Sequence, residues 1–370
     1  MPNKKLVLIG GGHTHVLLIH ALAIKPIHGV DVILISEKKL TPYSGMLPGY
    51  VAGYYSLAQT NIDLQRLCKT ANVEWIEKRV VDIDTVSQKI VSVNEETIHF
   101  DKLSIDIGST PDQSIKGANE FALGVKPIAG FQARWNDLLA SHDLKQLQGH
   151  WGIVGAGAGG VELVLAMAQR LKGSSELKLH LIYRGEHVLS GYPARVVTHA
   201  EKALEQLGVK QHPNFSVAEV TRDNIESISG ESIRLDQSIW CTGGVGAQWL
   251  KVTGIALNID NFIEVNEFLQ STSHQNIFAV GDVAEMINDP RPKAGVYAVR
   301  QAPILECNLR LAFNNQPLEP TDLQTQFLSL ISLGEKSAIA SRNGVVFKGR
   351  WVWRLKDWID QRFMALFNDR

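Results

Sequence analysis

Residues 152–162 read GIVGAGAGGVE, in which a short apolar run meets a glycine-rich stretch. Gly155, Gly157 and Gly160 complete the spacing G-x-G-x-x-G directly after a predicted strand, and the apolar helical run LVLAMAQRL follows. The start of such a helix presents unpaired N–H groups and a partial positive charge, and glycine lets a pyrophosphate approach the backbone. The spacing therefore predicts a dinucleotide-binding loop, with a merely tight strand-to-helix turn as the alternative.

A similar loop lies near the N-terminus, where residues 4–16 read KKLVLIGGGHTHV. Gly10 and Gly12 fit the same spacing, but His15 stands where the third glycine would allow a helix to pack closely on its strand. The helical run that follows is broken by Pro26, and a β-branched run, VDVILIS, comes next. Because both loops sit in a strand–helix–strand pattern, the predicted fold is α/β with two Rossmann-like dinucleotide-binding domains.

The two histidines of the first loop have different predicted roles. His13 begins the helix, so its backbone N–H and its ring can face a pyrophosphate; helix capping by Thr14 is the simpler alternative. His15 is predicted to be a buried histidine with its hydrogen bonds satisfied inside the protein. No third ligand is evident near this pair, so no metal site is predicted.

A charged residue follows the second strand of each strand–helix–strand unit, where the ribose or phosphate of a dinucleotide can be recognised. Glu37 can accept hydrogen bonds from a ribose, or it is a solvated residue beside Lys38 and Lys39. Arg184 can contact a 2′-phosphate, or it is a solvated arginine at a strand end. NADH and NADPH therefore both stay open as nucleotides for the second loop.

The composition is that of an ordinary soluble protein: 370 residues, 45% hydrophobic and 20% charged. With 37 basic and 38 acidic side chains, the formal net charge of −1 gives no reason to expect nucleic acid as a partner. No stretch approaches the roughly 18 apolar residues of a membrane span. The cysteines are far apart and form no C-x-x-C pair, which argues against a disulfide framework, a zinc site or a dithiol centre and favours the cytoplasm. They are Cys68, Cys241 and Cys307.

A third motif, NIFAVGDVAE, follows the two loops and contains Ala279, Gly281 and Asp282. The two loops, the glycine turns DIGST and CTGG, and this A-x-G-D motif come in an order that resembles the two-dinucleotide flavoproteins of the pyridine nucleotide-disulfide oxidoreductase family. The resemblance implies FAD at the first loop, with Asp282 against its ribityl chain, and NAD(P)H at the second loop. Gly108 and Gly243 would then mark the two crossovers between the domains, on the FAD and NAD(P) sides respectively.

The same resemblance implies that the second domain is inserted into the first. The predicted boundaries are 1–115 and 238–320 for the two parts of the FAD domain and 116–237 for the NAD(P) domain. Residues 321–370 would form a small α+β segment that ends in an amphipathic helix.

Within the family, residues 40–55, LTPYSGMLPGYVAGYY, lack the redox cysteine pair of the disulfide reductases. The chain is similar to type II NADH dehydrogenases in length, in the GGVE of the second loop and in its C-terminal region. The stretches GGGHTHV, KAGVYAVRQAP and WVWRLKDWIDQRF look like the oxidoreductase module found fused ahead of selenide, water dikinase. The resemblance implies hydride transfer from NAD(P)H to the flavin beside Glu162, and then electron transfer to a second acceptor.

The identity of that acceptor separates three hypotheses: a quinone reductase, a reductase of a selenium compound, or an FAD-containing binding or sensor protein. Gln301 matches a glutamine on the quinone side of the flavin in type II dehydrogenases, whereas Arg300 replaces a second one. Arg300 either stabilises an anionic ring or acceptor, or pairs with Glu306. Weaker candidates for the flavin cavity, with ordinary packing as the alternative, are Lys293, Tyr297 and Tyr43, whereas Cys241 is predicted to be structural.

Residues 350–367, RWVWRLKDWIDQRFMALF, are predicted to form the amphipathic helix. Trp351 and Trp358 lie beside its apolar face, and the basic residues lie elsewhere. Peripheral contact with the inner face of a membrane, docking on the preceding domains and a homodimer contact are the alternatives for this helix. The predicted apolar face consists of Val352, Leu355, Ile359, Phe363 and Leu366, and the basic residues placed off it are Arg354, Lys356 and Arg362.

Overall fold

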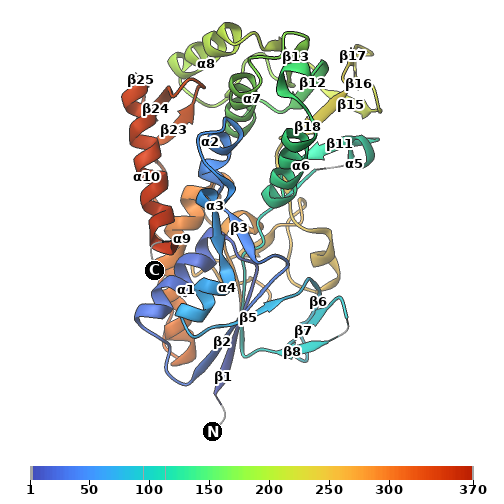
Figure 1. Cartoon of the computed structure of the whole chain (residues 1–370). Helices are drawn as coiled ribbons and strands as arrows, with labels where there is room; N and C mark the ends of the chain where they lie inside the picture. The colour runs from blue at the N-terminus through green and yellow to red at the C-terminus, as the bar shows by residue number, and fades with distance from the viewer. Residues whose placement is uncertain (1–2, 95, 113, 369–370) are drawn as a thin grey trace.

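The computed structural model describes residues 3–94, 96–112 and 114–368 and contains two parallel-sheet units with a C-terminal segment along one side (Figure 1). The first sheet has the order β21-β9-β1-β2-β5 and is parallel throughout. Its central strand is buried from Leu6 to Ile9, as expected when both faces of a sheet are covered. The strands are β1 (Lys4–Ile9), β2 (Val30–Ser36), β5 (Glu74–Glu77), β9 (Lys102–Ile105) and β21 (Ile277–Ala279).

Two long helices cover one side of this sheet. Helix α1 (His13–Ile24) starts at the first glycine loop and packs on α9 (Gly295–Phe313). The remaining elements of the first unit are β3 (Leu40–Pro42), β4 (Asn61–Asp63), β6 (Val80–Asp84), β7 (Lys89–Ser92), β8 (Thr97–His99), β20 (Ile263–Val265), β22 (Ala284–Met286), α3 (Leu57–Thr60), α4 (Leu64–Thr70) and the 3₁₀ turns η1 (Ser44–Met46), η3 (Gln248–Val252) and η4 (Gly281–Val283). Helix α2 (Leu47–Val51) comes from the same part of the chain but packs on α7 (Ala158–Arg170) of the second unit.

The second unit repeats the arrangement with the sheet order β11-β18-β12-β13-β14. Helix α7 (Ala158–Arg170) starts at the second glycine loop. Because β18 pairs with β12 in this sheet, the second unit extends through Trp240, past its predicted end at residue 237. Its other elements are β11 (Ala122–Gly124), β12 (Gly149–Val154), β13 (Leu177–Ile182), β14 (Lys210–His212), β15 (Val217–Val220), β16 (Asn224–Ser227), β17 (Ser232–Arg234), β18 (Gln237–Trp240), α5 (Ala118–Phe121), α6 (Ile128–Ser141), α8 (Ala194–Gln206) and η2 (Leu144–Gln146).

The chain leaves the first unit and returns to it through adjacent segments. Strand β10 (Thr110–Pro111), after β9, pairs antiparallel with β19 (Gly244–Val245), after β18. The second unit is therefore inserted into the first, which confirms the predicted topology.

The C-terminal segment is an antiparallel sheet followed by a long helix that runs beside both units (Figure 1). The predicted helix exists, and its buried face matches the predicted stripe in part: Val352 is buried as predicted. Met364 and Phe367 are buried as well, whereas Leu366 of the predicted stripe is 40% exposed. The prediction counted apolar residues only, and the buried face also contains the Lys356–Asp360 ion pair. No helix in the described residues is both long and apolar enough to cross a bilayer. The elements are β23 (Ser329–Ser332), β24 (Ala338–Arg342), β25 (Val345–Gly349) and α10 (Arg350–Asn368).

Candidate functional site

The three glycines of the second loop have three different environments. Gly155 has φ +112°, and a Cβ there would overlap the carbonyl oxygen of Cys241. A Cβ on Gly160 would overlap the carbonyl of Gly155, so helix and strand approach each other closely at this position. Gly157, by contrast, has no atom within 4 Å of its Cβ position. The backbone of this loop is therefore open where a phosphate would approach.

The first loop turns in the same way but differs at its third position. Gly10 has φ +91°, and a Cβ on it would overlap the carbonyl of Asp106. The buried ring of His15 lies with Nδ1 2.7 Å from the Gly10 carbonyl oxygen and Nε2 2.8 Å from Ser104 Oγ. Since a carbonyl only accepts, Nδ1 carries the proton and Nε2 accepts from the serine hydroxyl. The prediction of a satisfied structural histidine is confirmed.

A carboxylate caps the helix that begins at the first loop. Asp106 Oδ2 accepts the backbone N–H groups of Thr14 at 3.0 Å and His15 at 3.1 Å. Burial raises the pKa of Asp106 to about 7, the two N–H bonds oppose this shift, and the neighbouring Asp282 adds to it. The Thr14 hydroxyl instead donates to the Ala298 carbonyl of α9, so the alternative in which the Thr14 side chain caps the helix is wrong. The sequence analysis missed Asp106, although a charged residue at the end of the apolar strand β9 is unusual.

Asp282 is held by a lysine that the sequence did not single out. Lys126 Nζ lies 2.6 Å from Asp282 Oδ2 and 2.9 Å from Ser109 Oγ, next to the glycine turn at Gly108. Burial lowers the pKa of His13 to about 4. The negative charge of Asp282 also acts on His13 and opposes that shift in pKa, but burial has the larger effect. The first loop, the turn after β9 and the A-x-G-D motif therefore converge.

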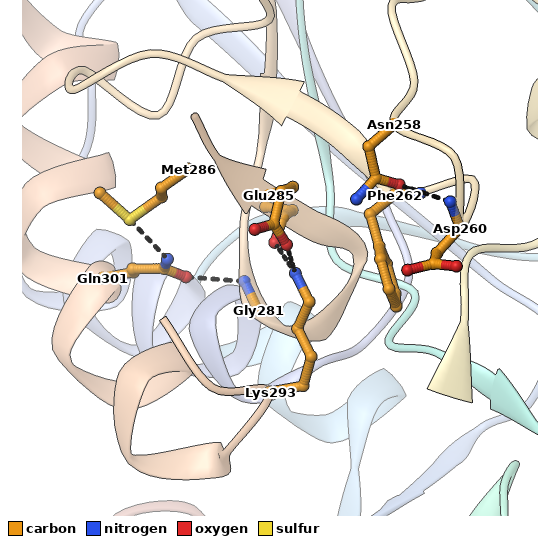
Figure 2. Close-up of polar contacts among 9 residues, drawn as sticks. Asn258, Asp260, Phe262, Gly281, Glu285, Met286, Lys293 and Gln301 are labelled. Carbon is orange, nitrogen blue, oxygen red and sulfur yellow. Dashed lines mark hydrogen bonds and ion pairs between the residues drawn. The ribbon is translucent and has the colours of Figure 1, made fainter. Parts of the chain in front are cut away.

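Gln301 fixes the turn that carries Asp282, as Figure 2 shows. Its side-chain oxygen accepts the Gly281 N–H at 2.7 Å, and its Nε2 faces Met286 Sδ at 3.9 Å. In the same view, Lys293 forms an ion pair with Glu285 at 2.6 Å.

The weaker aromatic candidates have partners inside the protein. Tyr297 packs edge-on against Phe327. The ring of Tyr43 packs against those of His13 and Phe363, with centroid distances of 5.2 and 4.4 Å.

Arg300, one residue before Gln301, does not pair with Glu306 as one alternative predicted. Glu306 pairs instead with Arg310 at 2.9 Å. Within the described residues, Nη1 of Arg300 is buried and has no hydrogen-bond partner. A buried guanidinium nitrogen without an acceptor fits a site that an anionic or polar ligand completes.

Glu162, on the first turns of α7, lies where the two units meet the C-terminal segment. Its Oε1 accepts the N–H of Ser332 in β23 at 2.8 Å. Burial raises the pKa of Glu162, and Lys356 opposes that shift. Lys356 pairs with Asp360 at 2.7 Å, and Asp360 accepts the Tyr43 hydroxyl at 3.2 Å. We call Glu162, Lys356, Asp360 and Tyr43 the buried junction.

The remaining predicted residues lie at the edges of this arrangement. Glu37 and Arg184 are both exposed at the ends of their strands. Gly108 and Gly243 each have no atom within 4 Å of their Cβ positions, so both crossover turns leave space beside the backbone.

The sequence signature of the family described as pyridine nucleotide-disulphide oxidoreductase matches residues 4–302. The chain belongs to this family. As a member, it is an FAD-dependent oxidoreductase that uses a pyridine nucleotide.

Individual relatives are distant but span most of the chain. It is 24% identical to the NADH dehydrogenase-like protein YutJ of Bacillus subtilis, over 90% of this chain and 91% of that protein. It is also 24% identical to the demethylphylloquinone reductase NdbB of a Synechocystis strain, over 76% of this chain and 72% of the relative. The NDH2 structure from Plasmodium falciparum in complex with NADH superposes with a TM-score of 0.78 at 15% identity and covers 98% of each chain.

The residues present fit both dinucleotides. At the second loop, open space at Gly157 and Gly243 suits the nicotinamide nucleotide. At the first loop, the turn at Gly10, the open turn at Gly108 and the unpaired nitrogen of Arg300 suit FAD.

Proposed function

We propose that this chain is an NAD(P)H:quinone oxidoreductase. The observation that carries the proposal is the second loop, in which Gly157 faces open space while α7 directly beyond it carries Glu162. A protein that only binds a partner would have no need of this second site. The name of the Synechocystis relative, a demethylphylloquinone reductase, supports a quinone as the acceptor.

FAD, when bound, accepts a hydride from the reduced nicotinamide and delivers two electrons to the acceptor. The chain supplies the binding, orientation and field around this chemistry. Asp282 orients the cofactor, with Lys126 and Gln301 holding the acidic turn in place. Arg300 would contribute a positive charge that favours negative charge developing in the site. Glu162 would lie beside the nicotinamide, held by the Ser332 N–H.

We further propose that the outer face of α10 contacts an anionic membrane surface. Trp351 and Trp358 are 53% and 56% exposed, although the opposite face of the helix is buried against the protein. Three exposed basic residues, Arg350, Arg354 and Arg362, lie on the same helix. Exposed tryptophans with nearby basic residues suit a membrane interface better than they suit open water.

An acceptor screen tests the function. NADH or NADPH is mixed with the oxidised protein without oxygen, and loss of the flavin absorbance is followed by stopped flow. The reduced protein is then mixed with ubiquinone and menaquinone analogues, or with selenite and a selenodisulfide. We expect reduction within seconds and reoxidation by the quinones. Absence of reduction would sink the dehydrogenase proposal, and reoxidation by the selenium compounds alone would favour the selenium-linked reductase.

A further inference from the structure

The two glycine loops of this chain differ in the residue that faces the start of the helix. Asp106 follows β9 as Cys241 follows β18, and the carbonyl of each lies against the first glycine of its loop. The first loop therefore faces a carboxyl group at the position where the second faces a thiol. The Cys241 sulfur lies 3.6 Å from the Cβ position of Gly159 in the first turn of α7.

The carboxyl group engages donors that a phosphate would otherwise use. Oδ2 of Asp106 accepts two N–H groups from the first turn of α1, those of Thr14 and His15. In the described residues, no side chain accepts the N–H groups at the start of α7. An ionised Asp106 thus offsets the partial positive charge that makes a helix start attractive to a pyrophosphate.

Asp106 also lies between Gly12 of the first loop and Gly281 of the A-x-G-D turn. A Cβ on Gly12 or on Gly281 would collide with Oδ1 of this carboxyl group. The side chain is buried, with 3% of the residue exposed. The carboxyl group is therefore enclosed by these two segments and shielded from water.

The charges around Asp106 favour its neutral form. Asp282 lies close enough to raise the pKa of Asp106, and Lys126 pairs with Asp282. Burial lowers the pKa values of both His13 and His15 to about 4, so these rings are neutral at pH 7. Among the described residues, no lysine or arginine forms an ion pair with Asp106. Pyrophosphate at this loop would add further negative charge beside a carboxyl group that has hydrogen bonds but no paired cation.

We propose that Asp106 is a positioning residue that holds a proton whenever the first loop binds FAD, so that FAD binding takes up one proton from solvent. With the proton on Oδ1, Oδ2 still accepts both N–H groups, but the side chain no longer carries the negative charge that offsets the attraction of the helix start for the pyrophosphate. The affinity for FAD then falls as the pH rises above the value at which free Asp106 ionises. The proposal rests on FAD binding at the first loop, which the flavin spectrum of the purified protein checks independently.

The test is FAD release from the purified holoprotein after dilution, followed by the recovery of free FAD fluorescence between pH 6 and 9. For wild type we expect a dissociation constant that is flat below about pH 7 and rises about tenfold per pH unit above it. Asp106→Asn keeps an acceptor and a neutral side chain, so its dissociation constant should stay flat and low throughout. A flat profile in wild type, or an unchanged slope in Asp106→Asn, would overturn the proposal.

Two further measurements keep the test decisive if Asp106→Asn does not fold. FAD added back to the deflavinated full-length chain at pH 8 in a weak buffer with an indicator dye should take up about one proton per FAD; no uptake overturns the proposal. Binding of NAD⁺, which cannot reduce the flavin, to the holoprotein is the internal control. The pKa of Cys241 is raised to about 11 by burial, so the residue facing the second loop does not ionise in this range. The dissociation constant of NAD⁺ should be flat between pH 6 and 9, and a slope equal to that of FAD would mean that the effect is not due to Asp106.

Discussion

The side-chain oxygen of Gln301 accepts a hydrogen bond of 2.7 Å from the backbone N–H of Gly281, so α9 holds the turn that carries Asp282. Gln301→Leu keeps the side-chain volume but leaves this N–H unpaired in a buried place. We expect the free energy of unfolding to fall by about 1–3 kcal/mol and FAD to be released at a lower urea concentration. Urea unfolding followed by flavin fluorescence measures both. Met286→Leu removes only the weak contact to Gln301 Nε2 and should cost less than about 1.5 kcal/mol. Equal losses in the two variants would contradict this role of Gln301.

The Lys126–Asp282 pair predicts a second effect on cofactor binding. Lys126→Met leaves the carboxylate of Asp282, whose side chain is 19% exposed, without its cation. Because Lys126 itself is 39% exposed, solvent screens the pair, and we expect FAD to dissociate only about three- to tenfold more readily. Lys116→Met breaks the exposed Lys116–Glu219 pair in the second unit and should leave FAD release unchanged. A similar change in both variants would point to general charge loss.

The buried junction predicts strong coupling between two residues of α10. Lys356→Met leaves Asp360 buried without its cation, which should lower the free energy of unfolding by about 3–5 kcal/mol. Combining Lys356→Met with Asp360→Leu removes both charges, so the double variant should recover a large part of that free energy. Urea unfolding of the singles and the double in a mutant cycle measures the coupling. Lys172→Met, at the exposed Lys172–Glu335 pair, should cost less than about 1 kcal/mol. Purely additive effects of Lys356→Met and Asp360→Leu would rule out the coupling.

The sequence predicted the loops well because their glycine spacing is set by local backbone geometry, as at Gly155 and Gly10. It missed Asp106 and Lys126 because their partners are far away in the sequence: Asp106 bonds to the start of α1, and Lys126 bonds to Asp282. Such contacts depend on strand order, which spacing does not reveal. The buried face of α10 was predicted only in part for a related reason, since an apolar pattern does not anticipate a buried ion pair.

The role of Arg184 decides between NADH and NADPH as the preferred nucleotide. Its side chain is exposed at the end of β13, where a 2′-phosphate of NADPH would lie. If Arg184 binds that phosphate, Arg184→Ala should raise the KM for NADPH about 10- to 100-fold and leave the KM for NADH within about twofold. The reason is that only NADPH loses a charge-assisted hydrogen bond. Steady-state kinetics with both nucleotides measures the ratio. Arg222→Ala, which removes an exposed arginine between β15 and β16, is the control and should change neither KM. Equal changes for NADH and NADPH in Arg184→Ala would exclude the 2′-phosphate role.

The exposed tryptophans of α10 predict how the protein meets a membrane. Replacing both Trp351 and Trp358 by serine removes the apolar side chains proposed to enter the membrane interface. Because both side chains are more than half exposed, each change should alter the free energy of unfolding by no more than about 0.5 kcal/mol. We expect wild type to float with vesicles of phosphatidylglycerol and phosphatidylethanolamine, and the double variant to stay in the soluble fraction. Val86→Ser, at a 95% exposed apolar residue of the first unit, should float like wild type. If wild type does not float but its sedimentation shows a dimer that the double variant lacks, then this face of α10 is a contact between two copies of the chain instead.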